Sequence, residues 1–167
     1  MFLIVRAALY AGLFISFFFI WLPGRLLSAS GIEFPKAIGP VEVAGAVFAV
    51  AGSILVLWCI LMLVFVGRGT PAPFDPPQHL VTTGPYRFTR NPMYMGASIA
   101  LLGTALFYQS YALLVYAVAF LLLSHLFVVW YEEPAVRRRF PHQYPVYCTK
   151  ARRWFELSNA RRPLTHS

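Results

Sequence analysis

Long uncharged apolar runs constrain this chain more than any other feature of its sequence. Residues 43–66 contain no charged side chain, and residues 92–131 contain no Asp, Glu, Lys or Arg. A third run, residues 2–22, is interrupted only by Arg6. A helix needs about 20 apolar residues to cross the hydrocarbon core of a bilayer. Charged residues make up 12% of the chain, whereas soluble domains carry about 25%. The bilayer is therefore the expected solvent.

The longest run is long enough for two helices. Gln109 and Ser110 form a polar pair near the middle of residues 92–131, which is typical of a hairpin tip. We therefore predict an all-α integral membrane protein, because only helices satisfy the backbone within each segment. About four transmembrane helices are expected, of which the third is close to the lower length limit for a span. The predicted spans are residues 2–22, 43–66, 92–108 and 111–131.

The first span resembles a secretory signal peptide, but the residues after it lack a clear small-x-small cleavage pattern. The run is also long for such a segment, so we expect a retained helix.

We divide the chain into residues 1–79, with two helices and their loops, and residues 80–167, which hold the informative polar motifs. Pro23, Gly24 and further breakers predict an outer loop over residues 23–42. Cys59 and Cys148 form neither a disulfide framework nor a metal-ligand pattern.

Basic residues are divided unequally between the two sides of the membrane that these spans define. With a cytoplasmic N-terminus, the 67–91 connection and the tail from 132 also lie in the cytoplasm, and only Arg25 and Lys36 lie outside. The positive-inside rule favours this orientation. The net charge of +8 then reflects topology and anionic lipid headgroups, and nothing suggests nucleic-acid binding. The twelve basic residues predicted inside are Arg6, Arg68, Arg87, Arg90, Arg137, Arg138, Arg139, Lys150, Arg152, Arg153, Arg161 and Arg162.

The C-terminal tail is polar, basic and aromatic. Trp154 and Phe155 follow Arg152 and Arg153 directly. This combination suits a segment that lies on the membrane surface. We therefore expect the four helices to be followed by a basic, aromatic cytoplasmic segment.

Polar residues gather where the third span begins, at the predicted cytoplasmic face. Asn91 followed by Pro92 indicates a helix start, with Asn91 as the N-cap. The free N–H groups of that helix end suit an anionic group. Gly96, one turn further, would let another group approach the backbone closely. An ordinary helix cap with interfacial Tyr and Arg anchors remains the alternative, as does lipid-phosphate binding by Arg87 and Arg90.

Acidic residues gather at the cytoplasmic end of the fourth span. Glu132 and Glu133 would oppose the dipole of a helix that ends there, so a positive partner is expected. Arg87, Arg90 and a cationic ligand are the candidates. Alternatively, Pro134 starts a new helix with Glu133 in its first turn. His125 precedes Glu132 by seven residues, on the same helix face and roughly 10 Å deeper. It is either a functional group or a neutral histidine between helices.

These motifs together resemble the isoprenylcysteine carboxyl methyltransferase and phospholipid methyltransferase superfamily. The similarity covers about residues 80–155, and the first 79 residues match only as generic spans. Each element is weak, but their order and spacing are specific. The matching elements are Gly84, Tyr86, Arg90-Asn91-Pro92, Tyr94, Gly96, Glu132-Glu133, Phe140, Tyr144, Tyr147 and Arg153-Trp154.

The resemblance implies a membrane-embedded site for S-adenosylmethionine and methyl transfer to a lipophilic acceptor, either a prenylcysteine-like carboxylate or a lipid amine. Arg90 and Glu133 would be catalytic. Two departures stand out: Asn91 replaces the usual histidine and cannot titrate near neutral pH, and Pro141 replaces a glycine. The cofactor would be bound by Tyr86, Arg90, Asn91, Tyr94, Gly96, His125, Glu132 and Glu133.

Two other functions remain open at this point. Sterol-reductase-like membrane proteins share an Arg-His-Pro-x-Tyr element and a Glu-rich helix end, and use NADPH, but usually have more spans. A non-catalytic membrane subunit or small transporter is the third possibility. Against a transporter, His125 is the sole intramembrane ionisable residue in these spans apart from Arg6, so no charged relay crosses the bilayer.

Overall fold

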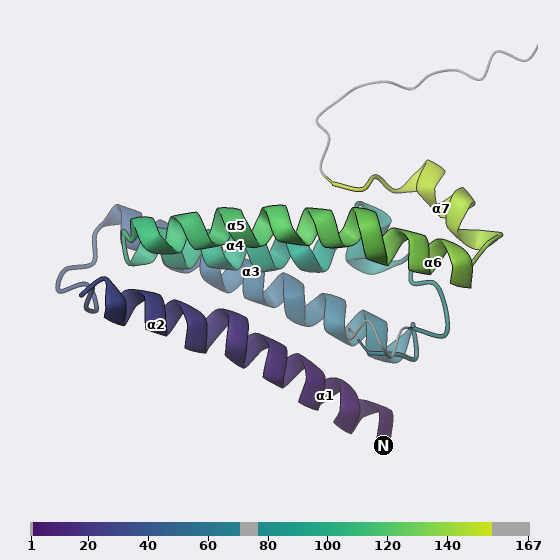
Figure 1. The fold of residues 1–167 in the computed structure, drawn as a ribbon, viewed down its shortest axis with the longest axis horizontal. Helices are drawn as coiled ribbons and strands as arrows, with labels where there is room; N and C mark the ends of the chain where they lie inside the picture. Colours follow the sequence, from purple (N-terminus) through teal and green to yellow (C-terminus); the bar gives the residue numbers. More distant parts are fainter. Residues whose placement is uncertain (1, 71–76, 155–167) are drawn as a thin grey trace, which may run out of the picture.

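The computed structural model describes residues 2–70 and 77–154. Within these ranges the chain is helical and contains no β-ladder, although an isolated parallel bridge joins Thr89 to Arg152. Four long helical rods lie side by side, and two short helices extend beyond one end of the bundle (Figure 1). Three of the rods are long and apolar enough to cross a membrane, and a shorter apolar helix is the fourth. The predicted all-α fold is confirmed.

The first rod is longer than the sequence predicts. It consists of α1 (Phe2–Ile15), the π-helical segment η1 (Ser16–Trp21) and α2 (Leu22–Ala29). The prediction that Pro23 and Gly24 begin a loop is therefore wrong. Proline lacks an N–H and its ring crowds the preceding turn. The wider π-turns directly before Pro23 accommodate that ring, so the helix continues for two further turns.

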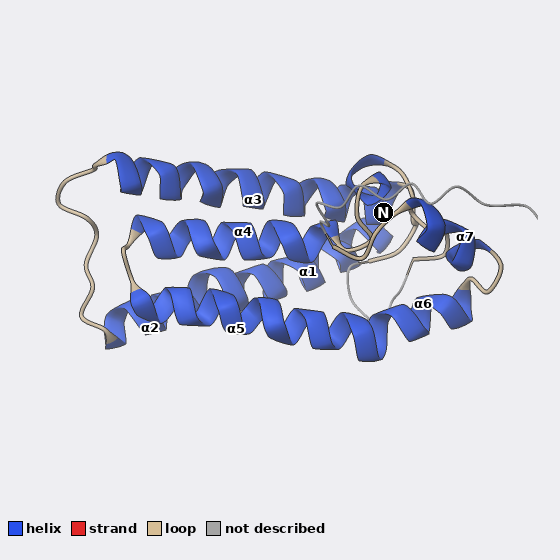
Figure 2. Ribbon diagram, turned by 90° about the horizontal axis from the view of Figure 1, so that it is seen from above, coloured by secondary structure: helices blue, strands red, loops and turns tan. Residues whose placement is uncertain are grey.

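The other three rods follow the predicted spans. Helix α3 (Pro40–Phe65) and helix α4 (Pro92–Phe107) begin at prolines, as helices often do. Helix α5 (Tyr111–Phe127) continues through the π-helical segment η3 (Val128–Glu132) into α6 (Glu133–Arg139). Figure 2 shows α4 between α3 and α5. This position explains how a helix of only 16 residues can lie among the membrane spans. Protein rather than lipid covers much of its surface.

Glycines bring α3 and α4 into unusually close contact. A Cβ on Gly52 would lie 2.5 Å from the carbonyl oxygen of Gly96, and one on Gly96 would lie 2.9 Å from that of Gly52. Gly45 and Gly103 make the equivalent approach nearer the other end of the two helices. Small residues let helix backbones approach in a membrane, where packing replaces the hydrophobic effect as the force for association. The pair α3–α4 is thus a closely packed contact within the bundle.

The hairpin between α4 and α5 turns where the sequence predicts. Gln109 has a left-handed backbone (φ 46°), and the Ser110 hydroxyl accepts a hydrogen bond from the Leu113 N–H at 3.3 Å. The Gln109 side-chain amide donates to the buried carboxylate of Glu42 on α3. This contact fixes the far end of the bundle, opposite the polar motifs.

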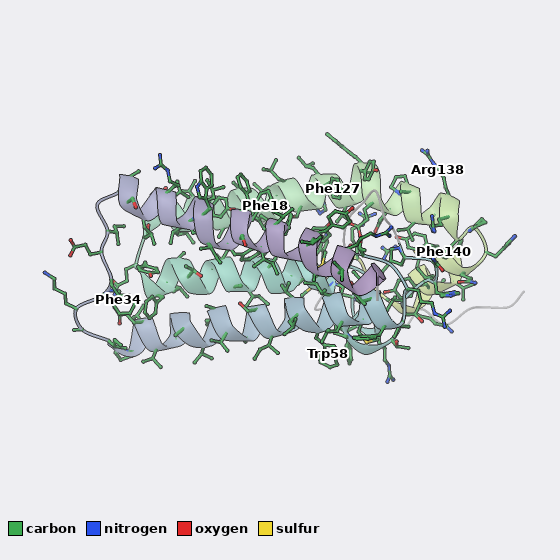
Figure 3. All side chains as sticks on the ribbon, turned by 90° about the horizontal axis from the view of Figure 1, so that it is seen from below. Phe18, Phe34, Trp58, Phe127, Arg138 and Phe140 are labelled. Atoms are coloured by element: carbon green, nitrogen blue, oxygen red, sulfur yellow. The ribbon has the colours of Figure 1, made fainter. Side chains whose placement is uncertain are left out.

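The polar motifs and the N-terminus share the other end. There the chain forms the 3₁₀ segment η2 (Gly84–Arg87), then α4, and after α6 the short helix α7 (Gln143–Lys150). Figure 1 places the start of α1 at this end as well, and Figure 3 shows Arg138 there, with Phe34 at the opposite end. The predicted surface segment is described as far as Trp154, while Phe155 lies outside the described residues.

Candidate functional site

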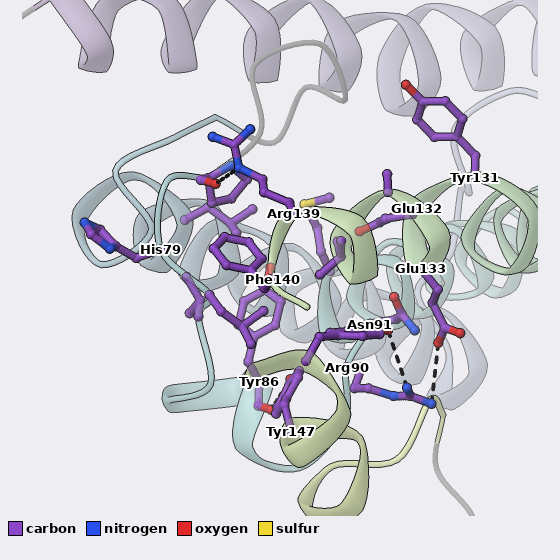
Figure 4. A pocket seen from close by; sticks show the side chains of 18 of the residues that line it. His79, Tyr86, Arg90, Asn91, Tyr131, Glu132, Glu133, Arg139, Phe140 and Tyr147 are labelled. Atoms are coloured by element: carbon purple, nitrogen blue, oxygen red, sulfur yellow. Dashed lines mark hydrogen bonds and ion pairs between the residues drawn. The ribbon is translucent and has the colours of Figure 1, made fainter. Parts of the chain in front are cut away.

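A cavity of about 510 Å³ opens at the end of the bundle that carries α6 and α7. Its volume lies within the range of roughly 300–1,000 Å³ usual for small-molecule sites. Its walls come from the connection before α4, the first turn of α4, the end of α5, and helices α6 and α7 (Figure 4). The polar residues that line it are Thr70, His79, Tyr86, Arg90, Asn91, Tyr94, Tyr131, Glu132, Glu133, Arg138, Arg139, Tyr144 and Tyr147.

Tyr94 and Glu132 form a pair between the first turn of α4 and the end of η3. The Tyr94 hydroxyl donates to Glu132 Oε2 at 2.7 Å. In the described part of the chain, Glu132 Oε1 accepts no hydrogen bond, and no ion pair reaches this carboxylate. Glu132 therefore has acceptor capacity left over inside the cavity.

Glu133 has very different surroundings. Arg153 binds it with both arms of the guanidinium: Nε donates to Oε1 at 2.9 Å and Nη2 to Oε2 at 2.7 Å. Arg90 Nη2 lies 3.4 Å from Glu133 Oε1 on the other side. The hydrogen bonds to Glu133 raise the pKa of Arg153 above its usual value. The expected positive partner is present, and it is Arg153 together with Arg90.

The two glutamates do not end a helix, which corrects one of the two sequence interpretations. Glu133 is the first residue of α6, with Pro134 in its first turn. Because the helix continues through η3 to Arg139, the carboxylates face no exposed helix C-terminus. The second interpretation, with Glu133 at a helix start before Pro134, describes the local structure, and basic Arg137, Arg138 and Arg139 occupy the last turn.

Arg90 is held from one side by α7. Its Nη1 donates to Cys148 Sγ at 2.6 Å and to Tyr144 Oη at 3.4 Å, and its guanidinium lies 5.9 Å from the centre of the Tyr144 ring. Arg90 Nε is buried and has no hydrogen-bond partner in the described part of the chain. A buried unpaired donor is costly unless a ligand completes it.

Asn91 lines the cavity and also makes a contact that the sequence does not suggest. It precedes α4 as predicted, but its side chain makes no cap hydrogen bond, so the predicted N-cap interaction is wrong. Instead Nδ2 donates to the carbonyl oxygen of Arg153 at 3.1 Å. Thr89 Oγ1 donates to the same oxygen at 2.9 Å, and the Arg90 N–H donates to the Arg152 carbonyl at 2.7 Å. The segment 151–154, which we call the strap, is thereby fastened to residues 89–91.

Tyr86 and Tyr147 close the side of the cavity nearest α3. Gly84, with φ of +61°, turns the chain into η2 and directs the Tyr86 ring against Cys59. The Tyr147 hydroxyl donates to the Tyr86 carbonyl at 2.6 Å. Burial raises the pKa of Tyr86 well above its usual value and also raises the pKa of Tyr147. Both phenols therefore remain protonated donors at physiological pH.

The structure does not bring Gly96 or His125 to the cavity. Gly96 faces α3, so the backbone that approaches it is that of Gly52. His125 is exposed on α5, and its Nδ1 accepts a hydrogen bond from Trp154 Nε1 at 2.9 Å. The π-helical segment η3 lies between His125 and Glu132, and its extra residue per turn rotates them onto different faces.

A second cavity, of about 670 Å³, adjoins the first one inside the bundle. It lies between the first rod and helices α4 and α5, and most of its lining is aliphatic or aromatic. Met93, Tyr94 and Phe127 line both cavities. An apolar chamber among the spans thus meets a polar chamber at the end of the bundle, and Tyr94 stands at their junction.

Fold and cavities define the class: a multi-pass membrane protein with a cavity lined by charged residues at one end of its helices, next to an apolar chamber. The chain belongs to the phospholipid methyltransferase family, whose model matches residues 41–143. This assignment makes it a membrane methyltransferase. No curated protein and no solved structure matches the chain.

Several lining residues were not named as site residues from the sequence. Tyr144 and Tyr147 are spaced three apart, which places them on one face of α7 and could have identified them. Arg153 does not line the cavity and belongs to the motif element Arg153-Trp154, but no local pattern predicts its contact with Glu133, 20 residues away on a different element. Arg87, a candidate partner for the glutamates, is exposed and does not line the cavity.

Proposed function

We propose that this protein uses S-adenosylmethionine to methylate a lipophilic acceptor, either a prenylcysteine-like carboxylate or a lipid amine. The observation that carries the proposal is the junction at Tyr94, where a polar cavity meets an apolar one. A membrane methyltransferase must bring a zwitterionic methyl donor and an apolar acceptor to one point, and these two chambers suit the two partners.

The residues that line the polar cavity fit the donor chemically. S-adenosylmethionine supplies a methyl group on a positive sulfur, together with an ammonium, a carboxylate and a nucleoside. Among residues 2–70 and 77–154, nothing donates to Glu132 Oε1, which suits a cation, and the buried donor Arg90 Nε has no partner, which suits a carboxylate. The Tyr86 and Tyr144 side chains add aromatic surface and hydroxyl groups.

Methyl transfer passes directly from donor to acceptor and needs no covalent intermediate on the protein. The acceptor's lone pair forms the new bond to carbon while the sulfur–carbon bond breaks and its electron pair returns to sulfur. Positioning and exclusion of water then account for most of the rate. The apolar chamber holds the acceptor's chain, and the Tyr94–Glu132 pair orients its reacting end. For an amine acceptor, Glu132 can take up the ammonium proton before the attack.

The test uses purified protein reconstituted in lipid nanodiscs. We expect saturable binding of S-adenosylmethionine and none of NADPH, measured by titration calorimetry. Protein incubated with methyl-labelled S-adenosylmethionine and a membrane lipid extract should then transfer label to the organic phase. Base treatment separates the two acceptor classes, because it releases label from a methyl ester and not from a methylamine. Binding of NADPH instead would support the reductase alternative.

A further inference from the structure

The two adjacent glutamates have unequal partners, although the sequence presents them as a pair. Both oxygens of Glu133 accept hydrogen bonds from Arg153, and Arg90 approaches it at 3.4 Å. Glu132 receives one hydrogen bond, from Tyr94, in the described part of the chain. A carboxylate bound at both oxygens by one guanidinium has little capacity left for a ligand. The two acids are therefore not equivalent.

Arg153 acts on Glu133 from outside the cavity. It does not line the cavity, and it lies on the strap, beyond the residues 41–143 that the family model matches. Thr89 and Asn91 both donate to the carbonyl oxygen of Arg153, and Arg90 N–H donates to that of Arg152. These contacts use backbone oxygens. They fix where the Arg153 side chain starts, and they do not depend on what that side chain is.

The contact between Arg153 and Glu133 affects which groups Arg90 can bind. If Arg153 were absent, Arg90 would be the cation closest to Glu133 among those that form ion pairs with it in the described part of the chain, and would be drawn into a tight pair with it. With Arg153 bound to both oxygens, Arg90 remains at 3.4 Å from Glu133, and its Nη1 contacts Cys148 and Tyr144. Arg90 Nε then stays unpaired beside the cavity.

We propose that Arg153 is a positioning residue that assigns different roles to the two glutamates. It neutralises Glu133 from outside the cavity. Glu132 is then the carboxylate that can bind a cationic group of the ligand, and Arg90 is the cation that can bind an anionic group. This inference rests on the proposed function, since the ligand with both groups is S-adenosylmethionine. Glu133 is then a structural counter-ion, and Glu132 is the acid that contacts the ligand.

The experiment measures S-adenosylmethionine affinity for full-length variants in nanodiscs. In Arg153→Met, Arg90 becomes the nearest ion-pair partner of Glu133 and is drawn away from the ligand, so the affinity should fall about tenfold, the effect of about 1.4 kcal/mol. Adding Glu133→Gln removes the charge that attracts Arg90, so the double variant should regain most of the loss. Arg153→Lys should lose less than Arg153→Met because it keeps the charge. Glu132→Gln should lose at least about tenfold, and adding Arg153→Met should not restore it.

Two controls separate this role from a general loss of structure. Lys150→Met removes a positive charge near the strap, from an exposed residue that does not line the cavity, and should leave the affinity unchanged. Hydrogen exchange of the peptide containing Arg90 N–H should be the same in Arg153→Met and the parent without ligand, because the strap contacts use backbone carbonyls. Faster exchange there would mean that the side chain holds the strap, and would overturn the proposed role.

Other results contradict the inference directly. If Glu133→Gln alone weakens binding as much as Glu132→Gln, both acids contact the ligand. If the double variant binds no better than Arg153→Met, the attraction of Arg90 to Glu133 is not the cause of the loss. A parent protein that binds no S-adenosylmethionine would refute the proposed function instead. Melting temperatures of the ligand-free single and double variants would then decide by themselves whether Arg153 and Glu133 are coupled.

Discussion

At the scale of single residues, Tyr94 connects the two chambers of the molecule. Its ring lines both cavities, and its hydroxyl donates to Glu132 at 2.7 Å. Helix α4 begins at Pro92, so Tyr94 lies in the first turn, where backbone N–H groups are not used within the helix. One side chain thus serves the packing of the apolar chamber and the hydrogen bonding of the polar one.

We expect Tyr94→Phe to lower the methyl-transfer rate about tenfold, the usual effect of losing a hydrogen bond to a charged group. The protein should stay folded because the ring is retained. The measurement is label transfer under saturating S-adenosylmethionine. Tyr116→Phe is the matched control, since it loses a bond of 3.0 Å from Tyr116 Oη to the Phe18 carbonyl and lines neither cavity. Equal losses in both variants would show that Tyr94 has no special role.

Asn91 gives a second test at this scale. Asn91→Ala removes the donor to the Arg153 carbonyl and should cost about 1 kcal/mol of stability. Asn91→Asp should cost more, because a carboxylate would face that carbonyl oxygen, whereas Asn91→His keeps a ring N–H that can donate. Thermal unfolding in detergent measures these differences. Gln143→Ala, at an exposed amide on α7, is the control. If Asp is tolerated as well as His, the contact with the strap contributes nothing.

At the scale of elements, the contact between α3 and α4 determines where the site forms. Gly45 and Gly52 on α3 face Gly103 and Gly96 on α4 at backbone distance. Tyr94 lies two residues before Gly96, so the closeness of the two helices fixes the depth of the site. The π-helical segments η1 and η3 each precede a proline, Pro23 or Pro134, and let the first and last rods continue past it.

Gly52→Ala should therefore destabilise the protein by about 1–3 kcal/mol, the usual cost of an overpacked contact. The added methyl group would lie 2.5 Å from the Gly96 carbonyl oxygen, and the obstacle is backbone that cannot move aside. Gly12→Ala on α1, which has nothing within 4 Å, should be neutral or slightly stabilising. Unfolding is followed, with both variants in a Cys148→Ala background, by a dye that reacts with the buried thiol of Cys59. Equal melting temperatures would contradict a tight contact.

At the scale of the whole molecule, the start of α1, the connection before α4 and helix α7 share one end of the bundle (Figures 1 and 2). Together with α6 and the strap, these segments carry ten of the fourteen basic residues of the chain. Basic segments stay in the cytoplasm more readily than they cross a membrane. We therefore propose that this end, which carries the cavity, faces the cytoplasm.

Thiol labelling tests the orientation. A membrane-impermeant maleimide should label Cys148, which is half-buried, only in opened cells or inverted vesicles, and should not label the fully buried Cys59. The variant Lys36→Cys in a Cys148→Ala background serves as the opposite control, because Lys36 is exposed in the outer connection. It should be labelled in intact cells. Labelling of Cys148 in intact cells would reverse the proposed topology.

The sequence by itself determined the spans and their order. Apolar runs report burial in the bilayer residue by residue, so the start of α4 at Pro92 and the turn at Gln109 and Ser110 follow from local sequence. The same holds for Arg90, Asn91, Tyr94 and the two glutamates, which the hairpin of α4 and α5 brings to one cavity. A short connection forces neighbouring helices together, and their facing ends must then meet.

Only the tertiary structure decided which partner each of these polar side chains contacts. The bond from Asn91 to the Arg153 carbonyl joins residues 62 apart, and no local pattern encodes a contact across that distance. The path of the strap decides that the Arg153 guanidinium binds the carboxylate of Glu133 and not that of Glu132. Gly96 packs against the backbone of α3 and so does not reach the cavity. The wider turn of η3 places His125 on a different helix face from Glu132. Such outcomes depend on which surfaces meet in space, because the partner of a buried polar group is set by packing.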